Sequence, residues 1–317
     1  MEKITFILLS LFFFSFNAFA FSPSEFDEEE FIVNVFWHKV INLPKQKRPG
    51  VALVLGGGGA RGFAHIGVFK VLEKEKVPVD LVIGTSIGSI AGAFYCAGIS
   101  LDKVEELAKN INWKSVSNFS APSIISMLLS EELLSNAQVE NFLKKNIGDL
   151  RFDELKIPLV CVATDLNTGE RILLREGSVA FAARASSTLP GFFKPVEYRQ
   201  RYLVDGGLAE NIPVAVAKLF DPDVIIAVQV SADITKNATN NVFATFMQAI
   251  YIQGKVLDTE NIAAADILIR PEVGEMSAAD LSHAYQTIEK GFSAAKESLK
   301  NIKTTIIDNT EESFFFE

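Results

Sequence analysis

The sequence of 317 residues contains only two cysteines and three histidines, and its formal net charge is −9. No histidine or cysteine is grouped with carboxylates at the spacing of metal ligands, so the sequence predicts no metal site. The negative charge disfavours a nucleic-acid partner, because phosphate binding draws most of its affinity from clustered lysine and arginine. We therefore expect neither a metal cofactor nor a nucleic-acid ligand.

Long hydrophobic runs are also missing, since no segment after residue 20 reaches 18 uninterrupted apolar residues. Residues 1–20 contain Lys3, a thirteen-residue apolar run at 4–16, and the small residues Ala18 and Ala20, which is the layout of a secretory signal peptide. The run is too short to cross a hydrocarbon core of about 30 Å as a helix. We predict a cleaved signal peptide and a periplasmic or secreted protein that is soluble or peripherally bound to a membrane.

The two cysteines, Cys96 and Cys161, lie in apolar segments, the first in an expected helix and the second in an expected strand. Two separate buried thiols fit these positions best. A disulfide stays open as an alternative, because export permits one and the sequence does not reveal the Cα separation that a bridge requires.

The chain divides into four segments: the signal peptide (1–20), an extension and linker (21–50), one large domain (51–306) and a tail expected to be disordered (307–317). In the large domain, segments with strand and helix patterns alternate. This order predicts an α/β fold with a mostly parallel central sheet and helices on both faces. Strands are expected at 51–55, 79–84, 157–164, 223–231 and 267–271, and helices at 63–76, 87–97, 178–187, 241–265 and 279–302.

A G-x-S-x-G motif, with Gly84, Ser86 and Gly88, follows the second expected strand and precedes a helix. This context is typical of a nucleophile elbow, in which glycines permit a sharp turn that exposes the serine. A helix N-terminus at the same place favours negative charge that develops on a substrate. The alternative is a tight turn with a serine that only caps the helix.

A second glycine-rich turn, 56–62, follows the first expected strand. Such a turn can point several N–H groups at one anion. Because Gly57, Gly59 and Gly62 match G-x-G-x-x-G, dinucleotide binding is the alternative. That function calls for an acidic residue at the end of the next strand, whereas Asp80 lies near the start of it. We therefore predict an oxyanion site and no nucleotide cofactor.

Asp205, followed by Gly206 and Gly207, comes directly after a short apolar segment. Two glycines allow a close turn that could bring the carboxylate against Ser86 as a base. The alternative is a solvent-facing Asp-Gly turn. None of the three histidines lies at the end of an expected core strand, where a Ser-His-Asp triad would need its base.

These three motifs, in this order, resemble the patatin-like phospholipase family, particularly its bacterial members, from about residue 51 to 220. The resemblance implies a three-layer α/β catalytic domain that cleaves lipid acyl esters with a Ser-Asp dyad and no cofactor. Ser86 would be the nucleophile and Asp205 the base. The oxyanion hole would comprise Gly57, Gly58, Gly59, Arg61 and Ile87, and the further motif glycines would be Gly62, Gly84, Gly88, Gly206 and Gly207.

Other functions remain open at this point: a carboxylesterase of soluble esters, and a lipid-binding protein without catalysis on the same fold. The apolar segment 116–135 is either a lid that touches a lipid interface or an ordinary core helix. His65 is expected to be structural, and Asp165 and Glu170 to form a turn at the end of a strand. The oligomeric state is left undetermined.

Overall fold

The computed structural model describes residues 28–111, 136–230 and 242–316, except 275, 279 and 312. The predicted signal peptide and the segment 116–135 lie outside the described residues. The chain forms two compact units, one from residues 50–299 and the other from residues 28–49 with 300–316.

The larger unit is built on one eight-stranded sheet with the order β5-β6-β3-β2-β1-β7-β8, and β4 pairs with β3 off this path. The strands β3, β2, β1, β7 and β8 run parallel to one another. The strands are β1 (Val51–Leu55), β2 (Leu81–Thr85), β3 (Leu159–Asp165), β4 (Arg171–Leu174), β5 (Val196–Tyr198), β6 (Arg201–Asp205), β7 (Val224–Val228) and β8 (Ile267–Ile269).

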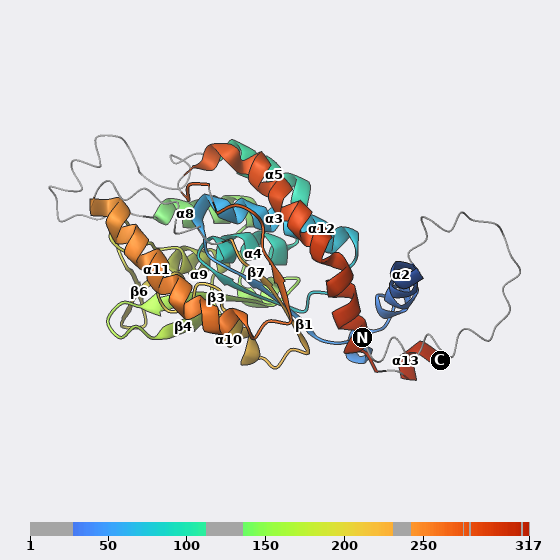
Figure 1. The fold of residues 1–317 in the computed structure, drawn as a ribbon. Helices are drawn as coiled ribbons and strands as arrows, with labels where there is room; N and C mark the ends of the chain where they lie inside the picture. Colours follow the sequence, from blue (N-terminus) through green and yellow to red (C-terminus); the bar gives the residue numbers. More distant parts are fainter. Residues whose placement is uncertain are drawn as a thin grey trace, which may run out of the picture. The chain divides into compact units, whose positions relative to one another are not determined.

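Both faces of the sheet are covered by helices, as Figure 1 shows for α3, α4 and α5 above the sheet and α10 and α11 below and in front of it. Every residue of β1, β3 and β7 is buried, which is why these strands are continuous apolar runs instead of alternating ones. The α/β fold class predicted from the sequence is confirmed.

The α-helices of the described ranges agree closely with the expected ones where the pattern is long, as in α4, α9 and α11. Five further helices, α2, α5, α8, α10 and α13, lie in stretches where the sequence predicts no helix. The α-helices are α2 (Glu28–Val40), α3 (Ala64–Lys74), α4 (Ile87–Ala97), α5 (Leu101–Asn110), α8 (Ala137–Ile147), α9 (Val179–Ser186), α10 (Val214–Lys218), α11 (Val242–Ile262), α12 (Ala284–Asp308) and α13 (Ser313–Phe316). Short 3₁₀-helices are η1 (Lys45–Lys47), η2 (Gly59–Phe63), η3 (Phe152–Glu154), η4 (Gly206–Leu208) and η5 (Leu281–His283).

The smaller unit does not follow the domain boundaries expected from the sequence, because it joins residues 28–49 with 300–316. The tail predicted to be disordered is helical through Asp308 and again in α13. Apolar side chains explain the difference, because Ile302, Ile306 and Phe315 are buried and the Phe315 ring packs edge-on against Phe36 of α2 at 5.0 Å between centroids. The C-terminal residues thus form a small hydrophobic core with α2, which lies in the extension predicted at 21–50.

Cys96 and Cys161 are both buried and both free. Burial raises the pKa of the Cys161 thiol to about 12, so this side chain is a neutral, small hydrophobe at physiological pH. Of the two alternatives from the sequence, separate buried thiols are the one observed.

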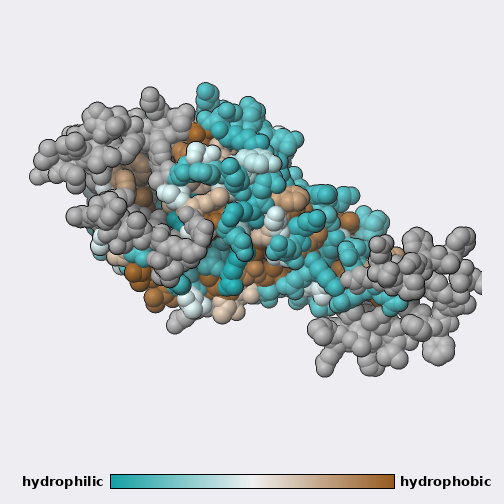
Figure 2. All heavy atoms as spheres, turned by 45° about the horizontal axis from the view of Figure 1, so that its top comes forward, coloured by the Kyte–Doolittle hydropathy of each residue, from teal (hydrophilic) through white to brown (hydrophobic). Residues whose placement is uncertain are grey.

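The surface in Figure 2 is mainly hydrophilic on the side shown, with smaller groups of hydrophobic side chains. In the larger unit, strongly exposed apolar side chains include Leu219, next to α10, and Ile252, Val256 and Leu257 on α11. Among the helices that the structure describes, none has the length and apolar character needed to cross a bilayer.

Candidate functional site

Ser86 lies in a strained turn between β2 and α4, with φ 56° and ψ −124°. A non-glycine residue at positive φ costs free energy and is typical of functional sites. The strain turns the chain abruptly from strand to helix at the carboxyl edge of the sheet. A sharp turn of this kind is the backbone geometry expected of a nucleophile elbow.

The two glycines of this motif are required by close backbone packing. A β-carbon at Gly84 would lie 2.6 Å from the backbone of Gly88, and one at Gly88 would meet the carbonyl of Leu55 on β1. Any larger residue would push α4 away from the sheet. The spacing of the motif therefore follows from the approach of this helix to strands β1 and β2.

Strand register explains why Asp205 meets Ser86, although 119 positions separate them in sequence. Thr85, at the end of β2, pairs with Val162 of β3, and Asp205, at the end of β6, pairs with Ala163. Adjacent residues of β3 therefore pair with the last residues of β2 and β6. The turns that follow the two strands must then lie side by side.

The Ser86 hydroxyl donates a hydrogen bond of 2.6 Å to Oδ2 of Asp205. The other carboxylate oxygen, Oδ1, accepts from the Gly207 N–H at 2.8 Å, which orients Oδ2 toward the serine. Burial raises the pKa of Asp205 to about 6, while the bonds from Ser86 and Gly207 lower it. The carboxylate is therefore a stronger base than a solvated aspartate, yet it is still ionised at neutral pH.

The glycine-rich turn lies beside Ser86, because a β-carbon at Gly57 would be 3.1 Å from that of Ser86. The structure differs from the prediction in the use of its amides. The N–H of Gly57 donates to the Asn211 carbonyl at 3.1 Å and that of Ala60 to Ala278 at 2.8 Å, so neither is available to a substrate.

Other amides remain as candidate donors to an oxyanion. Within the described residues, the N–H groups of Gly58, Gly59 and Ile87 donate to no protein acceptor. Gly59 adopts φ +60°, a conformation that glycine takes without strain. Gly62 packs against the Ile87 side chain and so joins the glycine-rich turn to the elbow.

Arg61 and His65 both hydrogen-bond to carbonyl groups of the glycine-rich turn. Arg61 is buried, and its Nε donates to the carbonyl of Gly58 at 3.2 Å, so its position is that of a support for the loop. His65 is fully buried and its Nε2–H donates to the Gly56 carbonyl at 2.9 Å. Burial lowers the pKa of His65 to about 4, so the ring is neutral at working pH, in line with a structural role.

Ser186, at the end of α9, is a contact of Ser86 that the sequence did not predict. Its hydroxyl oxygen accepts from the backbone N–H of Ser86 at 2.9 Å and its hydroxyl donates to the Val162 carbonyl at 2.5 Å. Ser186 thereby links the strained elbow to the centre of the sheet. Ser186 lies in a helix of small residues, and such a helix is too common to indicate this role.

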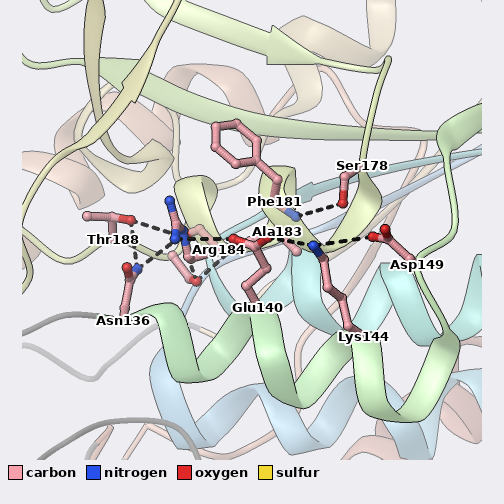
Figure 3. Close-up of polar contacts among 10 residues, drawn as sticks. Asn136, Glu140, Lys144, Asp149, Ser178, Phe181, Ala183, Arg184 and Thr188 are labelled. Atoms are coloured by element: carbon pink, nitrogen blue, oxygen red, sulfur yellow. Dashed lines mark hydrogen bonds and ion pairs between the residues drawn. The ribbon is translucent and has the colours of Figure 1, made fainter.

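The backbone of Asp205 is held from the opposite side by Thr188, whose carbonyl accepts from the Asp205 N–H at 2.8 Å. Figure 3 shows how α8 and α9 fix Thr188: the Asn136 amide donates to Thr188 Oγ1 at 2.8 Å, and Arg184 forms an ion pair with Glu140 at 3.1 Å. The site is therefore supported by both helices: α9 contacts Ser86 directly through Ser186, and α8 acts through its bonds to Arg184 and Thr188.

The remaining ionisable candidates lie elsewhere. Asp165 and Glu170 share Arg201 as an ion-pair partner at 2.8 and 2.6 Å in the turn between β3 and β4, as expected of structural residues. No histidine hydrogen-bonds Ser86 or Asp205. In the described ranges, no three side chains of the metal-binding types come together as a possible metal site.

The chain is similar in sequence to proteins of known families. An uncharacterized NTE family protein of Mycobacterium tuberculosis is 33% identical over 204 residues, which cover 63% of this chain and 55% of that protein. The human patatin-like phospholipase domain-containing protein 6 is 35% identical over 185 residues, 57% of this chain and 13% of that protein. The chain thus spans about half the length of the first relative and a small part of the second.

At the level of structure, the chain is similar to VipD from Legionella pneumophila, with a TM-score of 0.52 and 13% sequence identity over 82% of this chain and 67% of that one. This likeness concerns the fold. Residues 53–218, which include the glycine-rich turn, the elbow and the Asp205 turn, match the patatin-like phospholipase family. The chain belongs to the patatin-like phospholipase family.

Proposed function

We propose that this protein is a serine hydrolase of lipid acyl esters, with Ser86 as nucleophile and Asp205 as its base. The observation that carries the proposal is the 2.6 Å hydrogen bond from Ser86 Oγ to the buried carboxylate of Asp205. No other ionisable side chain in the described part of the chain hydrogen-bonds the serine hydroxyl, which supports this carboxylate as the base.

In the proposed reaction, Asp205 Oδ2 takes the hydroxyl proton while Ser86 Oγ attacks the ester carbonyl carbon. The N–H groups of Gly58, Gly59 and Ile87 stabilise the oxyanion of the tetrahedral intermediate. The proton on Asp205 passes to the departing alkoxide, which leaves an acyl ester on Ser86. Asp205 then takes a proton from water as the water oxygen attacks the acyl carbon, and it passes this proton to Ser86 Oγ as the bond from Oγ to the acyl carbon breaks, which releases the fatty acid and restores the serine.

An ester of a lipid is the favoured substrate over a soluble ester. The helix α11 packs against η4, the turn after Asp205, and it exposes Ile252 and Val256, with 46% and 67% of their surfaces accessible. Apolar side chains beside a hydrolytic site suit a substrate that arrives from a lipid phase. The names of relatives agree, since lysophospholipase NTE1 of Candida glabrata is 31% identical over 57% of this chain.

Substrate class is tested by comparing turnover of a diacyl phospholipid, a lysophospholipid, a triacylglycerol and a short-chain nitrophenyl ester. The proposal expects the highest kcat/KM with one of the three lipids. Faster turnover of the soluble ester than of every lipid would favour a carboxylesterase instead. Absence of turnover with all four, in folded protein, would favour the non-catalytic lipid-binding alternative.

The pH dependence of activity should follow the ionisation of Asp205. Burial raises the pKa of Asp205 to about 6, and only the ionised form accepts a proton. We expect kcat/KM to be level above this pKa and to fall about tenfold per pH unit below it. Asp258 also has a raised pKa of about 6, so the profile is repeated with Asp258→Asn, in which the acidic limb should persist. Its disappearance there would assign the limb to Asp258.

Replacing Gly57 with alanine should reduce kcat by about 10²- to 10³-fold, comparable to loss of an oxyanion donor. The new β-carbon would lie 2.5 Å from Oδ1 of Asn211 and 3.1 Å from the β-carbon of Ser86, so the turn must move. Gly50→Ala is a matched control, because Gly50 is not at positive φ and its added β-carbon would meet only Asp223 Oδ2, at an ordinary contact distance of 3.5 Å. Wild-type kcat in Gly57→Ala would show that the position of this turn does not matter.

A further inference from the structure

Asp258 is a buried carboxylate of α11, with 3% of its surface accessible, that the proposed mechanism does not use. It accepts hydrogen bonds from the side-chain amide of Asn211 at 3.2 Å and from the backbone N–H of Ile212 at 3.1 Å. No lysine or arginine of the described residues pairs with it. A buried charge without a cation is costly unless several donors compensate it, so these two bonds anchor Asn211 firmly to the helix.

Asn211 reaches from this anchor to the candidate catalytic centre. Its Nδ2 is committed to Asp258, so its Oδ1 faces the opposite way, to within 2.5 Å of the position of a β-carbon at Gly57 and 3.2 Å of one at Gly207. Its backbone carbonyl accepts from the Gly57 N–H at 3.1 Å. One residue therefore contacts both turns that flank Ser86 and Asp205.

The bond to Gly57 decides which amides of the glycine-rich turn remain open to a substrate. With the Gly57 N–H held by Asn211, the unused donors are those of Gly58 and Gly59. A shift of Asn211 would release Gly57 and move the next two amides with it. Because misplacement of a catalytic group by 1 Å can cost about 10²-fold in rate, the location of Asn211 has kinetic consequences.

We propose that Asp258 and Asn211 are a positioning pair: Asp258 fixes the Asn211 side chain and the peptide after it, and Asn211 holds the glycine-rich turn beside Ser86. The inference rests on the proposed hydrolase function and adds two residues to that site. It also gives α11 a role in the site, since a helix with exposed apolar side chains carries the carboxylate on which the turn depends.

The chemistry of the pair makes a nearly isosteric substitution informative. In Asp258→Asn, one of the two acceptor oxygens becomes an NH₂ group, so the side chain can no longer accept from both Nδ2 of Asn211 and the Ile212 N–H. Either the Asn211 amide rotates, which turns its NH₂ toward Gly57 and Gly207, or the bond is lost. In both cases the volume of the side chain is preserved and the buried charge is removed, so the fold should be retained.

The test compares Asp258→Asn and Asn211→Ala with wild type, measuring kcat and KM on a soluble nitrophenyl ester and the rate at which a fluorophosphonate probe labels Ser86. We expect kcat and the labelling rate to fall about 10- to 100-fold with KM within about twofold of wild type, because the loss falls on transition-state stabilisation. A merely structural role would lower the melting temperature without lowering kcat at a nearly constant KM. Asp80→Asn is the matched control, since its carboxylate caps the Val51 N–H at the opposite edge of the sheet.

The double variant shows whether the two residues act together. If Asp258 acts through Asn211, the total loss of kcat in the double variant Asp258→Asn/Asn211→Ala should be smaller than the product of the losses in the two single variants. Unchanged kcat in both single variants, or fully multiplicative effects, would overturn the positioning pair. If Asp258→Asn does not fold, Asn211→Ala carries the same test. Failure of the proposed function is a different result, because wild type itself would then be inert.

Discussion

Ser86→Ala is expected to abolish ester hydrolysis, with kcat reduced by about 10⁵- to 10⁶-fold. The side chain makes one hydrogen bond, to Asp205, and is the one hydroxyl placed between the base and the candidate oxyanion donors. Alanine keeps the β-carbon, so the strained backbone at φ 56° is no worse accommodated. Loss of activity should therefore come without loss of fold.

The measurement is turnover of a lipid and of a soluble ester, with circular dichroism and thermal melting of the same samples. Ser298→Ala is the matched control, because the Ser298 hydroxyl bonds only the Ala294 carbonyl of its own helix, and its activity should equal that of wild type. Residual turnover above about one-hundredth of the wild-type rate in pure Ser86→Ala would mean that another nucleophile performs the reaction.

Asp205→Asn should lower kcat by about 10³- to 10⁴-fold, in line with losses on neutralising the aspartate of other serine hydrolases. The asparagine carbonyl would keep the bond from Gly207 N–H, which leaves the NH₂ group toward Ser86. An amide NH₂ donates and cannot take the serine proton. The nucleophile would then lack its base while its surroundings stay in place.

The same substitution should make the protein more stable. Burial raises the pKa of Asp205 from 3.8 to about 6, so its charged form disfavours folding by about 3 kcal/mol at neutral pH. Because the folded-state pKa is the higher one, this penalty fades as the pH falls from 6 toward 3.8. We therefore expect Asp205→Asn to melt above wild type at pH 7.5 and with a smaller difference near pH 4.

Asp223→Asn provides the control, since its carboxylate caps the Gly50 N–H at the amino edge of the sheet and takes no part in the site. Activity near the wild-type level in Asp205→Asn would remove this residue as the base. A lower melting temperature than wild type at pH 7.5 would contradict the inferred cost of its buried charge.

Several features were predictable because they depend on neighbouring residues. The strand β1 and the helix α4 lie where the sequence predicts them, since an uninterrupted apolar segment and two glycine-bounded turns determine them locally. None of the strands β4, β5 and β6 was predicted from the sequence. They have three to five residues, are partly exposed, and run antiparallel, so none carries a buried run long enough to predict a strand.

The glycines at 84, 88 and 206 were determined by the sequence itself, because a β-carbon at each would lie 2.6 Å or less from a backbone atom. What tertiary structure alone decided is how the groups are used. The Gly57 N–H is bonded to the Asn211 carbonyl, and burial raises the pKa of Asp205. Asp258, which lies 46 positions after Ile212 in the sequence, accepts a hydrogen bond from the Ile212 N–H. Hydrogen-bond partners and desolvation depend on which distant segments meet, and the strand register that brings them together is a property of the folded sheet.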